Sequence, residues 1–201
     1  MVKLGKDRYC LIEINRKRGK PMPARIWLTA DTHFGHTNIL KYENRPFQNP
    51  EYLEHGSTEF MDSEIIKRWN NVVSKDDKVF HLGDVGIYGK EKMTEILSRL
   101  NGRKTLIMGN HDKGRNSGWW RDAGFDEVSK YPIIIEDYIV LQHEPPTYFN
   151  DATPFYFIYG HVHGTQLYRT VMRSAACVCV ERWDYTPVEL TKIQELVLLC
   201  E

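Results

Sequence analysis

Arg25-Ile-Trp-Leu-Thr-Ala-Asp-Thr-His33 is an apolar run that ends in polar and charged residues. Lys78-Val-Phe-His-Leu-Gly-Asp84 repeats the same order further along the chain. Short runs that are rich in branched and aromatic residues and stop at Gly, Asp or Asn are typical of β-strands. By this pattern, strands are predicted over residues 25–30, 78–82, 104–108, 133–136, 138–142, 155–159 and 176–181.

Helices are predicted between the early strands and near the C-terminus. Apolar residues recur at helical spacing within residues 50–73, 90–100 and 191–199. Strands separated by helices pair in parallel through right-handed crossovers, whereas the later, closely spaced strands favour antiparallel additions, including a hairpin that turns near Glu136-Asp137. We therefore expect an α/β fold with a mixed sheet, or two packed sheets, flanked by helices. In such folds ligands bind at the carboxyl ends of the strands.

Length and composition favour one globular domain. The chain has 201 residues, of which 41% are hydrophobic, and this is enough to build a core and to exclude a disordered protein. Residues 25–201 are assigned to the domain, and residues 1–24 to an N-terminal extension that could add an edge strand. The 27 basic and 27 acidic side chains cancel, so no overall attraction to nucleic acid or anionic membrane is expected, although local patches remain open.

Hydropathy and cysteine content favour a soluble cytoplasmic protein. No run approaches the roughly 20 apolar residues that span a bilayer. Four cysteines are too few and too irregularly placed for a disulfide framework in a chain of this length. Cys177 and Cys179 alternate within one predicted strand and so share a face; a metal-binding pair is one interpretation, but buried free thiols are favoured. No protein partner is evident.

Five short polar clusters follow predicted strands. They are Asp31-Thr-His33, Gly83-Asp84, Gly109-Asn-His-Asp112, His143 and Gly160-His-Val-His163. Seven of the eight histidines lie in or beside these clusters, and only His55 lies elsewhere. A single histidine at a strand end is more often a packed or capping residue, but five clusters together indicate a metal site.

The spacing and chemistry of these residues favour a centre of two metal ions. Asp31 and His33 are two residues apart, as are His161 and His163, so in extended backbone each pair would point to one side. Carboxylate, imidazole and amide ligands without a thiolate suit Mn²⁺, Fe or Zn²⁺ with open positions. If Asp31 and Asp84 were the only anionic ligands and a hydroxide bridged two divalent ions, a net charge of about +1 would remain to attract a phosphate.

These motifs, in this order, resemble those of the calcineurin-like metallophosphoesterases. The resemblance runs from about Ile26 to His163, and every motif is present. The stretches Asp-Thr-His-Phe-Gly-His-Thr-Asn-Ile-Leu40, His-Leu-Gly-Asp-Val85 and Trp-Asp-Tyr-Thr-Pro-Val188 are further similar to a group of small phosphoesterases of bacteria and their phages. The resemblance implies a four-layer α/β/β/α sandwich with two mixed sheets, and two divalent metal ions, with Mn²⁺ first and Fe, Zn or Ni as alternatives.

The resemblance also implies roles for individual residues. Asp84 would bridge the two ions; Asp31, His33 and His163 would bind the first, and Asn110, His143 and His161 the second. His111 would donate a proton to the leaving oxygen or hold the phosphate, and Asn110 would also meet the substrate. Asp112 could orient His111 or make a structural hydrogen bond within its loop. His36 could contact substrate, with a helix-capping or supporting role as the alternative.

One departure from the family narrows the expected substrate. Protein Ser/Thr phosphatases of this superfamily extend the second motif to Gly-Asp-x-Val-Asp-Arg-Gly, whereas this chain has Gly-Asp-Val-Gly-Ile-Tyr-Gly89. We therefore expect a phosphodiesterase that acts on a nucleotide-like or nucleic-acid substrate by attack of a metal-activated hydroxide. A phosphomonoesterase of the same fold is the alternative. A non-catalytic scaffold for protein interaction is a second alternative, and it is disfavoured because every ligand motif is retained.

Overall fold

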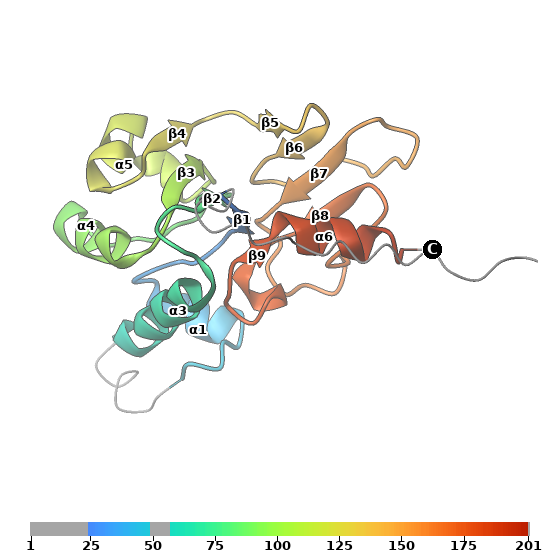
Figure 1. The fold of residues 1–201 in the computed structure, drawn as a ribbon. Helices are drawn as coiled ribbons and strands as arrows, with labels where there is room; N and C mark the ends of the chain where they lie inside the picture. The colour runs from blue at the N-terminus through green and yellow to red at the C-terminus, as the bar shows by residue number, and fades with distance from the viewer. Residues whose placement is uncertain (1–23, 49–56, 201) are drawn as a thin grey trace, which may run out of the picture.

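The computed structural model describes residues 24–48 and 57–200, which form two β-sheets flanked by helices (Figure 1). The first sheet has the order β4-β3-β2-β1-β9 and is parallel except for β9, which runs antiparallel to β1. Its strands are β1 (Ile26–Thr29), β2 (Lys78–His81), β3 (Arg103–Ile107), β4 (Glu127–Ser129) and β9 (Val188–Glu189). The extension predicted for residues 1–24 lies outside the described residues, except for its last residue.

The second sheet has the order β5-β6-β7-β8 and is also mixed, because β5 is antiparallel to β6 and the other pairs are parallel. Its strands are β5 (Ile133–Ile135), β6 (Ile139–Leu141), β7 (Tyr156–Tyr159) and β8 (Ala175–Cys177). The predicted hairpin is confirmed, since β5 and β6 are joined by a turn at residues 136–138. An isolated bridge between Ala30 and Cys179 links the chain after β1 to the chain after β8.

Helices pack on both sides of these sheets. They are α1 (Thr37–Tyr42), α3 (Glu59–Val72), α4 (Lys90–Arg99), α5 (Ser117–Ala123) and α6 (Leu190–Val197), with 3₁₀ turns at Asp112–Gly114 and Val180–Arg182. The helices α1, α3, α4 and α5 lie on the side of the first sheet that faces away from the second, and α6 lies beside β9 and β1 (Figure 1). Within residues 24–48 and 57–200, no helix combines the length and apolar character that a membrane crossing requires.

The core is divided by the alternation of side chains along β1. Trp27 joins the apolar cluster that packs under the helices α3, α4 and α5, whereas Leu28 joins the cluster between the two sheets. Successive side chains of a strand point to opposite faces, so a strand buried on both sides needs apolar residues at consecutive positions. The predicted class, two mixed sheets flanked by helices, is confirmed.

Several elements differ from the sequence prediction. The strands β4 and β9 and the helices α1 and α5 are additional, and all four are short. The strand expected over 176–181 ends at Cys177, and Val180–Arg182 forms a 3₁₀ turn. Cys177 and Cys179 nevertheless share a buried face, with their Sγ atoms 3.3 Å apart and no disulfide between them. The helix expected within 50–73 is α3, and residues 50–56 of that range lie outside the described chain.

Candidate metal centre

The loops that follow five strands of the two sheets bring the predicted ligands together. Asp31, Asp84 and Asn110 come after β1, β2 and β3 of the first sheet, and His143 and His161 come after β6 and β7 of the second. The carboxyl ends of neighbouring parallel strands meet at one edge of a sheet, which is where α/β folds bind ligands. The predicted gathering of the motifs at strand ends is therefore found in the structure.

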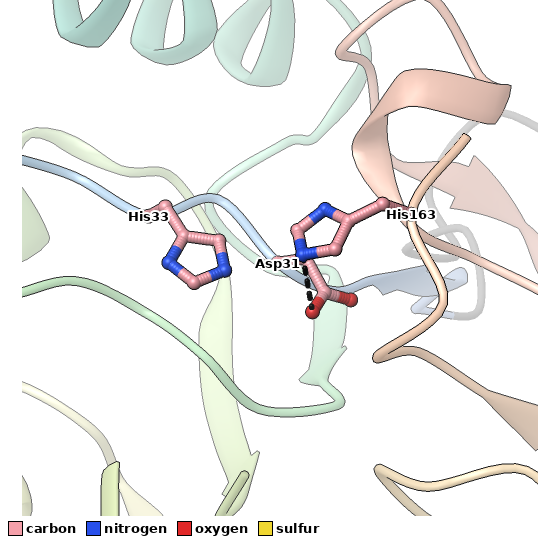
Figure 2. Close-up of side chains that lie close together, drawn as sticks. All are labelled: Asp31, His33 and His163. Carbon is pink, nitrogen blue, oxygen red and sulfur yellow. Dashed lines mark ion pairs between the residues drawn. The ribbon is translucent and has the colours of Figure 1, made fainter. Parts of the chain in front are cut away.

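Asp31, His33 and His163 form the first cluster, whose candidate ligand atoms all lie within 4.8 Å of one another. Figure 2 shows the His163 ring next to the Asp31 carboxylate and the His33 ring beside them, with Nε2 of His163 3.9 Å from Oδ1 of Asp31. Oδ2 of Asp31 accepts a hydrogen bond of 2.9 Å from the backbone amide of His161. Oδ1 of Asp31 is thereby left pointing toward the histidines.

Asn110, His143 and His161 form the second cluster. Oδ1 of Asn110 lies 2.8 Å from Nε2 of His143 and 3.0 Å from Nδ1 of His161, and the two histidine nitrogens are 3.2 Å apart. Ligands at adjacent corners of an octahedron are about 3 Å apart when each lies about 2.1 Å from the ion. Nδ1 of His143 is 2.7 Å from the Leu82 carbonyl, to which it donates, so its Nε2 lone pair faces the cluster.

Asp84 lies between the two clusters, with one carboxylate oxygen facing each. Its Oδ1 is 3.5 Å from Nε2 of His143, and its Oδ2 is 3.7 Å from Nε2 of His33. The side chain is 2% exposed, and Oδ1 also accepts a hydrogen bond from the backbone amide of His111. A carboxylate in this position could bind an ion through each oxygen.

The backbone is left-handed at five of the seven candidate ligands, which corrects the geometry expected from the sequence. The φ angles are +61° at Asp31, +51° at His33, +58° at Asp84, +71° at His161 and +47° at His163. The two Asp/His and His/His pairs therefore do not lie on extended strands, and tight turns bring their side chains together instead. Non-glycine residues rarely adopt this region, and such residues cluster at functional sites because the surrounding structure holds them there.

Glycines in the motifs allow the chain segments to approach closely. A Cβ atom on Gly83 would lie 2.5 Å from Nδ1 of His143 and 2.6 Å from the Cα of Gly109. A Cβ atom on Gly160 would lie 2.6 Å from Oδ2 of Asp31. These glycines are required because another backbone or a ligand side chain occupies the space of their missing side chain.

The electrostatics of the first cluster fit a divalent cation. Burial raises the pKa of the Asp31 carboxyl well above its usual range, although His163 opposes this effect. Burial, together with His163 and Arg45, lowers the pKa of His33 and keeps it neutral, the form that binds metal. Oδ1 of Asp31 and Nε2 of His33 are buried without a hydrogen-bond partner in the described part of the chain. A cation between them would satisfy both atoms and favour the charged carboxylate.

His163 titrates in the opposite direction. Burial alone would lower its pKa, but the hydrogen bond to Glu181 and the charge of Asp31 raise the pKa of His163 to about 9. An imidazolium is what two neighbouring carboxylates induce when no metal ion competes for the ring nitrogen. The same negative surroundings would favour a bound cation.

The candidate catalytic residues lie at the rim of the centre. The His111 side chain is 47% exposed, with Nε2 3.9 Å from Oδ2 of Asp84. His36 is the N-cap residue of α1, yet its side chain does not cap the helix; its Nδ1 lies 3.3 Å from Nδ1 of His33. Both rings are accessible enough to meet a substrate.

Asp112 lies beneath its loop. Its carboxylate accepts hydrogen bonds from the backbone amides of Gly109, Asp84 and Val85 at 2.7–3.1 Å, and the side chain is fully buried. Within the described residues these are the hydrogen bonds that its carboxylate makes. They favour the structural interpretation of Asp112 over the orienting one, since they tie the second and third motifs together.

Two charged residues that the sequence did not single out lie directly behind the first cluster. Arg45 is fully buried, and Glu181 is 6% exposed at its side chain and 3.0 Å from Nδ1 of His163. Neither lies in a strand-end motif, and 136 positions separate them. One feature of the sequence could have indicated Glu181. It directly follows the apolar run Cys-Val-Cys-Val180, as the polar clusters follow the other predicted strands.

Comparison with known proteins agrees with the fold. Residues 24–176 match the family model described as calcineurin-like phosphoesterase. The family match, together with the fold, thus defines a metal-dependent phosphoester hydrolase. The chain belongs to the calcineurin-like phosphoesterases.

Relatives occur in archaea, bacteria and phages. The chain is 37% identical over 180 residues to the uncharacterized protein MJ1445 of Methanocaldococcus jannaschii, covering 86% of this chain and 91% of that protein. It is 33% identical over 103 residues to the Gene 66 protein of Mycobacterium phage D29, covering 50% of this chain and 45% of that protein. The crystal structure of AQ665, a protein of unknown function from Aquifex aeolicus, superposes with a TM-score of 0.64 at 26% identity, covering 86% of this chain and 99% of that one.

Proposed function

We propose that this phosphoesterase hydrolyses phosphodiesters at a centre of two divalent metal ions bridged by Asp84. The observation that supports this most directly is the placement of the Asp84 oxygens, 3.5 Å from a histidine of one cluster and 3.7 Å from a histidine of the other. A carboxylate that served a single ion would not need a ligand set on each side.

The residues of the two clusters would hold the ions. Asp31, His33 and His163 would bind one, and Asn110, His143 and His161 the other. When bound, a pair of divalent ions lowers the pKa of a water and stabilises the attacking and leaving oxygens of an in-line displacement. Imidazole, amide and carboxylate ligands suit Mn²⁺, Fe or Zn²⁺, and the resemblance to the family implies Mn²⁺ first, with Fe, Zn or Ni as alternatives.

His111 would assist departure of the leaving group. Its ring is exposed and lies beside Asp84, on the open side of the centre. A histidine in this position can donate a proton to the departing alkoxide, a contribution of roughly 10²–10⁴-fold to the rate. His36 and Asn110 lie next to it and would contact the phosphoryl oxygens.

The engagement of two arginines near the centre favours a diester over a monoester. The guanidinium of Arg115 donates to the backbone carbonyls of Gly86, Ile87 and Tyr88, and that of Arg182 donates to the carbonyls of the loop after His161. These arginines support loops and are not free to bind a phosphate. A monoester dianion needs more compensating charge than a diester monoanion, so the diester suits this site better.

A cavity beside the second cluster supports a nucleotide-like substrate. Its volume is about 450 Å³, and its lining includes His143, Lys113, Lys130 and Tyr131. Tyr131 is 76% exposed, which leaves its ring free to stack on a base. Lys130 carries positive charge for a flanking phosphate, whereas Lys113 lies 4.0 Å from Glu144, which also lines the cavity. We infer that the cavity receives the nucleotide next to the scissile phosphate of a single-stranded nucleic acid.

Hydrolysis of bis(p-nitrophenyl) phosphate and p-nitrophenyl phosphate with added Mn²⁺ tests the reaction. We expect turnover of the diester to exceed that of the monoester, and Asp84→Asn to lower it by at least about 10³-fold through loss of the bridge. His111→Ala should slow a dinucleotide far more than the nitrophenyl diester, because nitrophenolate leaves without needing a proton. Absence of turnover with any divalent metal would favour the non-catalytic scaffold, and faster monoester turnover would favour the phosphomonoesterase.

Cleavage of a short single-stranded oligonucleotide tests the cavity. Lys130→Glu combined with Tyr131→Ala should weaken oligonucleotide cleavage by about tenfold or more, since stacking and phosphate contacts are both lost. Turnover of the nitrophenyl diester, which is too small to fill the cavity, should stay unchanged. Lys75→Glu makes the matched charge control, because Lys75 is exposed and lies in the turn before β2, at the opposite end of that strand from Asp84. Equal oligonucleotide cleavage by the double variant and the control would show that the cavity does not bind the substrate.

A further inference from the structure

Arg45 is a fully buried arginine whose guanidinium holds the backbone of the first cluster. It lies in the loop after α1, and its Nη2 and Nη1 donate to the carbonyls of Asp31 at 2.7 Å and Thr32 at 2.9 Å. These carbonyls belong to the left-handed turn that carries Asp31 and His33. A planar guanidinium with several donors in a fixed arrangement suits such a task better than a lysine would.

Glu181 completes the arrangement from the other sheet. Its Oε1 accepts hydrogen bonds from Nε and Nη2 of Arg45 at 3.0 and 2.5 Å, and from Nδ1 of His163 at 3.0 Å. A histidine whose Nδ1 is held by an acceptor binds metal through Nε2, and Nε2 of His163 faces Oδ1 of Asp31. Glu181 therefore sets both the tautomer and the direction of the His163 ring.

The pair thus contacts every residue or segment of the first cluster. Arg45 donates to the turn that carries Asp31 and His33, and Glu181 accepts from His163. The ion pair between Arg45 and Glu181 links these two contacts. The second cluster is held differently, by the Leu82 carbonyl on His143. Loss of the pair should therefore affect one ion and not the other.

Stability alone is a weak explanation for this ion pair. A buried pair loses hydration on both groups, and replacement by apolar side chains of similar size is often neutral or stabilising. A third ion is another possible reason for the acidic character here, because Glu43, His163 and Glu181 also offer ligand atoms within 4.8 Å. That ion would require Nδ1 of His163 as a ligand, whereas this nitrogen is already 3.0 Å from Oε1 of Glu181 as a hydrogen-bond donor.

We propose that Arg45 and Glu181 are positioning residues that preorganise the first ion site, selectively over the second. This inference rests on the proposed two-ion function. Its consequence is that the two ions are controlled separately: the Asp31 cluster depends on the hydrogen bonds made by Arg45 and Glu181, and the Asn110 cluster does not.

Titration of the metal-free protein with Mn²⁺ tests the proposal. Calorimetry measures the affinities, and electron paramagnetic resonance shows whether the bound ions are coupled. Wild type should bind two ions and give the signal of a coupled pair. Glu181→Met should bind the first-cluster ion about 10–100-fold more weakly and give the signal of an isolated ion at limiting Mn²⁺. Glu181→Gln keeps an acceptor oxygen for His163 and should retain most of the affinity.

Two further variants guard against misfolding. Arg45→Met with Glu181→Met leaves no unpaired buried charge, so it should stay folded and still show the weakened first ion. Asp77→Asn alters a second buried carboxylate paired with an arginine, Arg25 at 2.9 Å, at the opposite end of β1 and β2. It should lower the unfolding temperature without changing either ion affinity.

The outcomes separate this inference from the proposed function. Two ions bound with wild-type affinity by the double Met variant would overturn the positioning role and leave the two-ion function standing. Three ions in wild type and two in Glu181→Met would also overturn it, in favour of a third site. A wild type that binds no ion through the Asp31 cluster would contradict both proposals.

Discussion

Asp62 is a buried carboxyl next to the loop that carries His33. It lies in the first turn of α3, and its Oδ2 accepts hydrogen bonds from the hydroxyls of Thr58 at 2.9 Å and Tyr88 at 2.8 Å. Its Oδ1 lies 3.4 Å from the backbone amide of Gly35. Burial raises the pKa of Asp62 from 3.8 to about 6, although the hydrogen bonds from Tyr88 and Thr58 oppose the shift.

This raised pKa predicts how stability changes with pH. The folded state binds the Asp62 proton more tightly than the unfolded state. The protonated carboxyl therefore contributes its full share to the free energy of unfolding below pH 3.8, and this share is lost as the pH rises through about 6. The loss is on the order of 3 kcal/mol, from about 1.4 kcal/mol per pKa unit. Asp62→Asn, which stays neutral, should remove this decline and leave the variant more stable than wild type at pH 7.

Urea unfolding of both metal-free proteins between pH 4 and 7 measures the difference. The free-energy difference between variant and wild type should grow as the pH rises and level off above about pH 6. A constant difference across this range would show that Asp62 does not titrate as its burial requires.

At the residue scale, the sequence identified the candidate ligands but not what holds them. Asp31, Asp84 and His143 each follow an apolar strand, so their meeting at strand ends follows from the topology. Arg45 and Glu181 are brought together only by the packing of the two sheets, and a local pattern cannot indicate that contact. The left-handed turns at the ligands were also missed, because Asp and His in a polar segment do not distinguish extended from left-handed backbone.

Among the elements, the hairpin of β5 and β6 contains two consecutive left-handed residues. Glu136 and Asp137 have φ angles of +52° and +63°. This conformation costs a residue with a side chain roughly 1 kcal/mol, and asparagine and glycine tolerate it best. The residues Glu136 and Asp137 therefore lower the free energy of unfolding relative to residues that favour this turn.

Replacing Glu136→Asn and Asp137→Gly should stabilise the hairpin by about 1 kcal/mol and raise the unfolding temperature by about 2–4 °C. Thermal unfolding followed by circular dichroism measures the change. Asp151→Gly makes the control, because its φ lies outside the left-handed region and glycine there should only lower the unfolding temperature. An unchanged or lower unfolding temperature in the hairpin variant would mean that the turn carries no such cost.

The elements that were not predicted from the sequence are short, so they contain few residues from which a period can be recognised. The strand β9 is two residues long and exists through its antiparallel pairing with Trp27 and Leu28, some 160 positions earlier in the chain. The helix α1 has six residues and no side-chain cap. The helix α5 did have a signal, since Asn116 accepts a hydrogen bond from the amide of Trp119 as an N-cap residue does. Longer elements carried enough periodic apolar residues to be predicted.

At the scale of the whole molecule, the candidate centre joins the two sheets. The first sheet contributes Asp31, Asp84 and Asn110, and the second contributes His143 and His161. The Ala30–Cys179 bridge connects the same sheets close to the first cluster, and Arg45 links the turn after β1 to Glu181 in the 3₁₀ turn after β8. Under the proposed function, metal binding and the packing of the sheets would therefore be coupled, and Asp84 would lie between the two ions.

A crystal structure of the protein loaded with Mn²⁺, with anomalous scattering used to locate the metal, tests this arrangement most directly. Two anomalous peaks about 3.5–4 Å apart are expected, one beside Asp31, His33 and His163 and the other beside Asn110, His143 and His161, with one oxygen of Asp84 bound to each. A single peak, or two peaks that Asp84 does not bridge, would contradict the proposed two-ion centre.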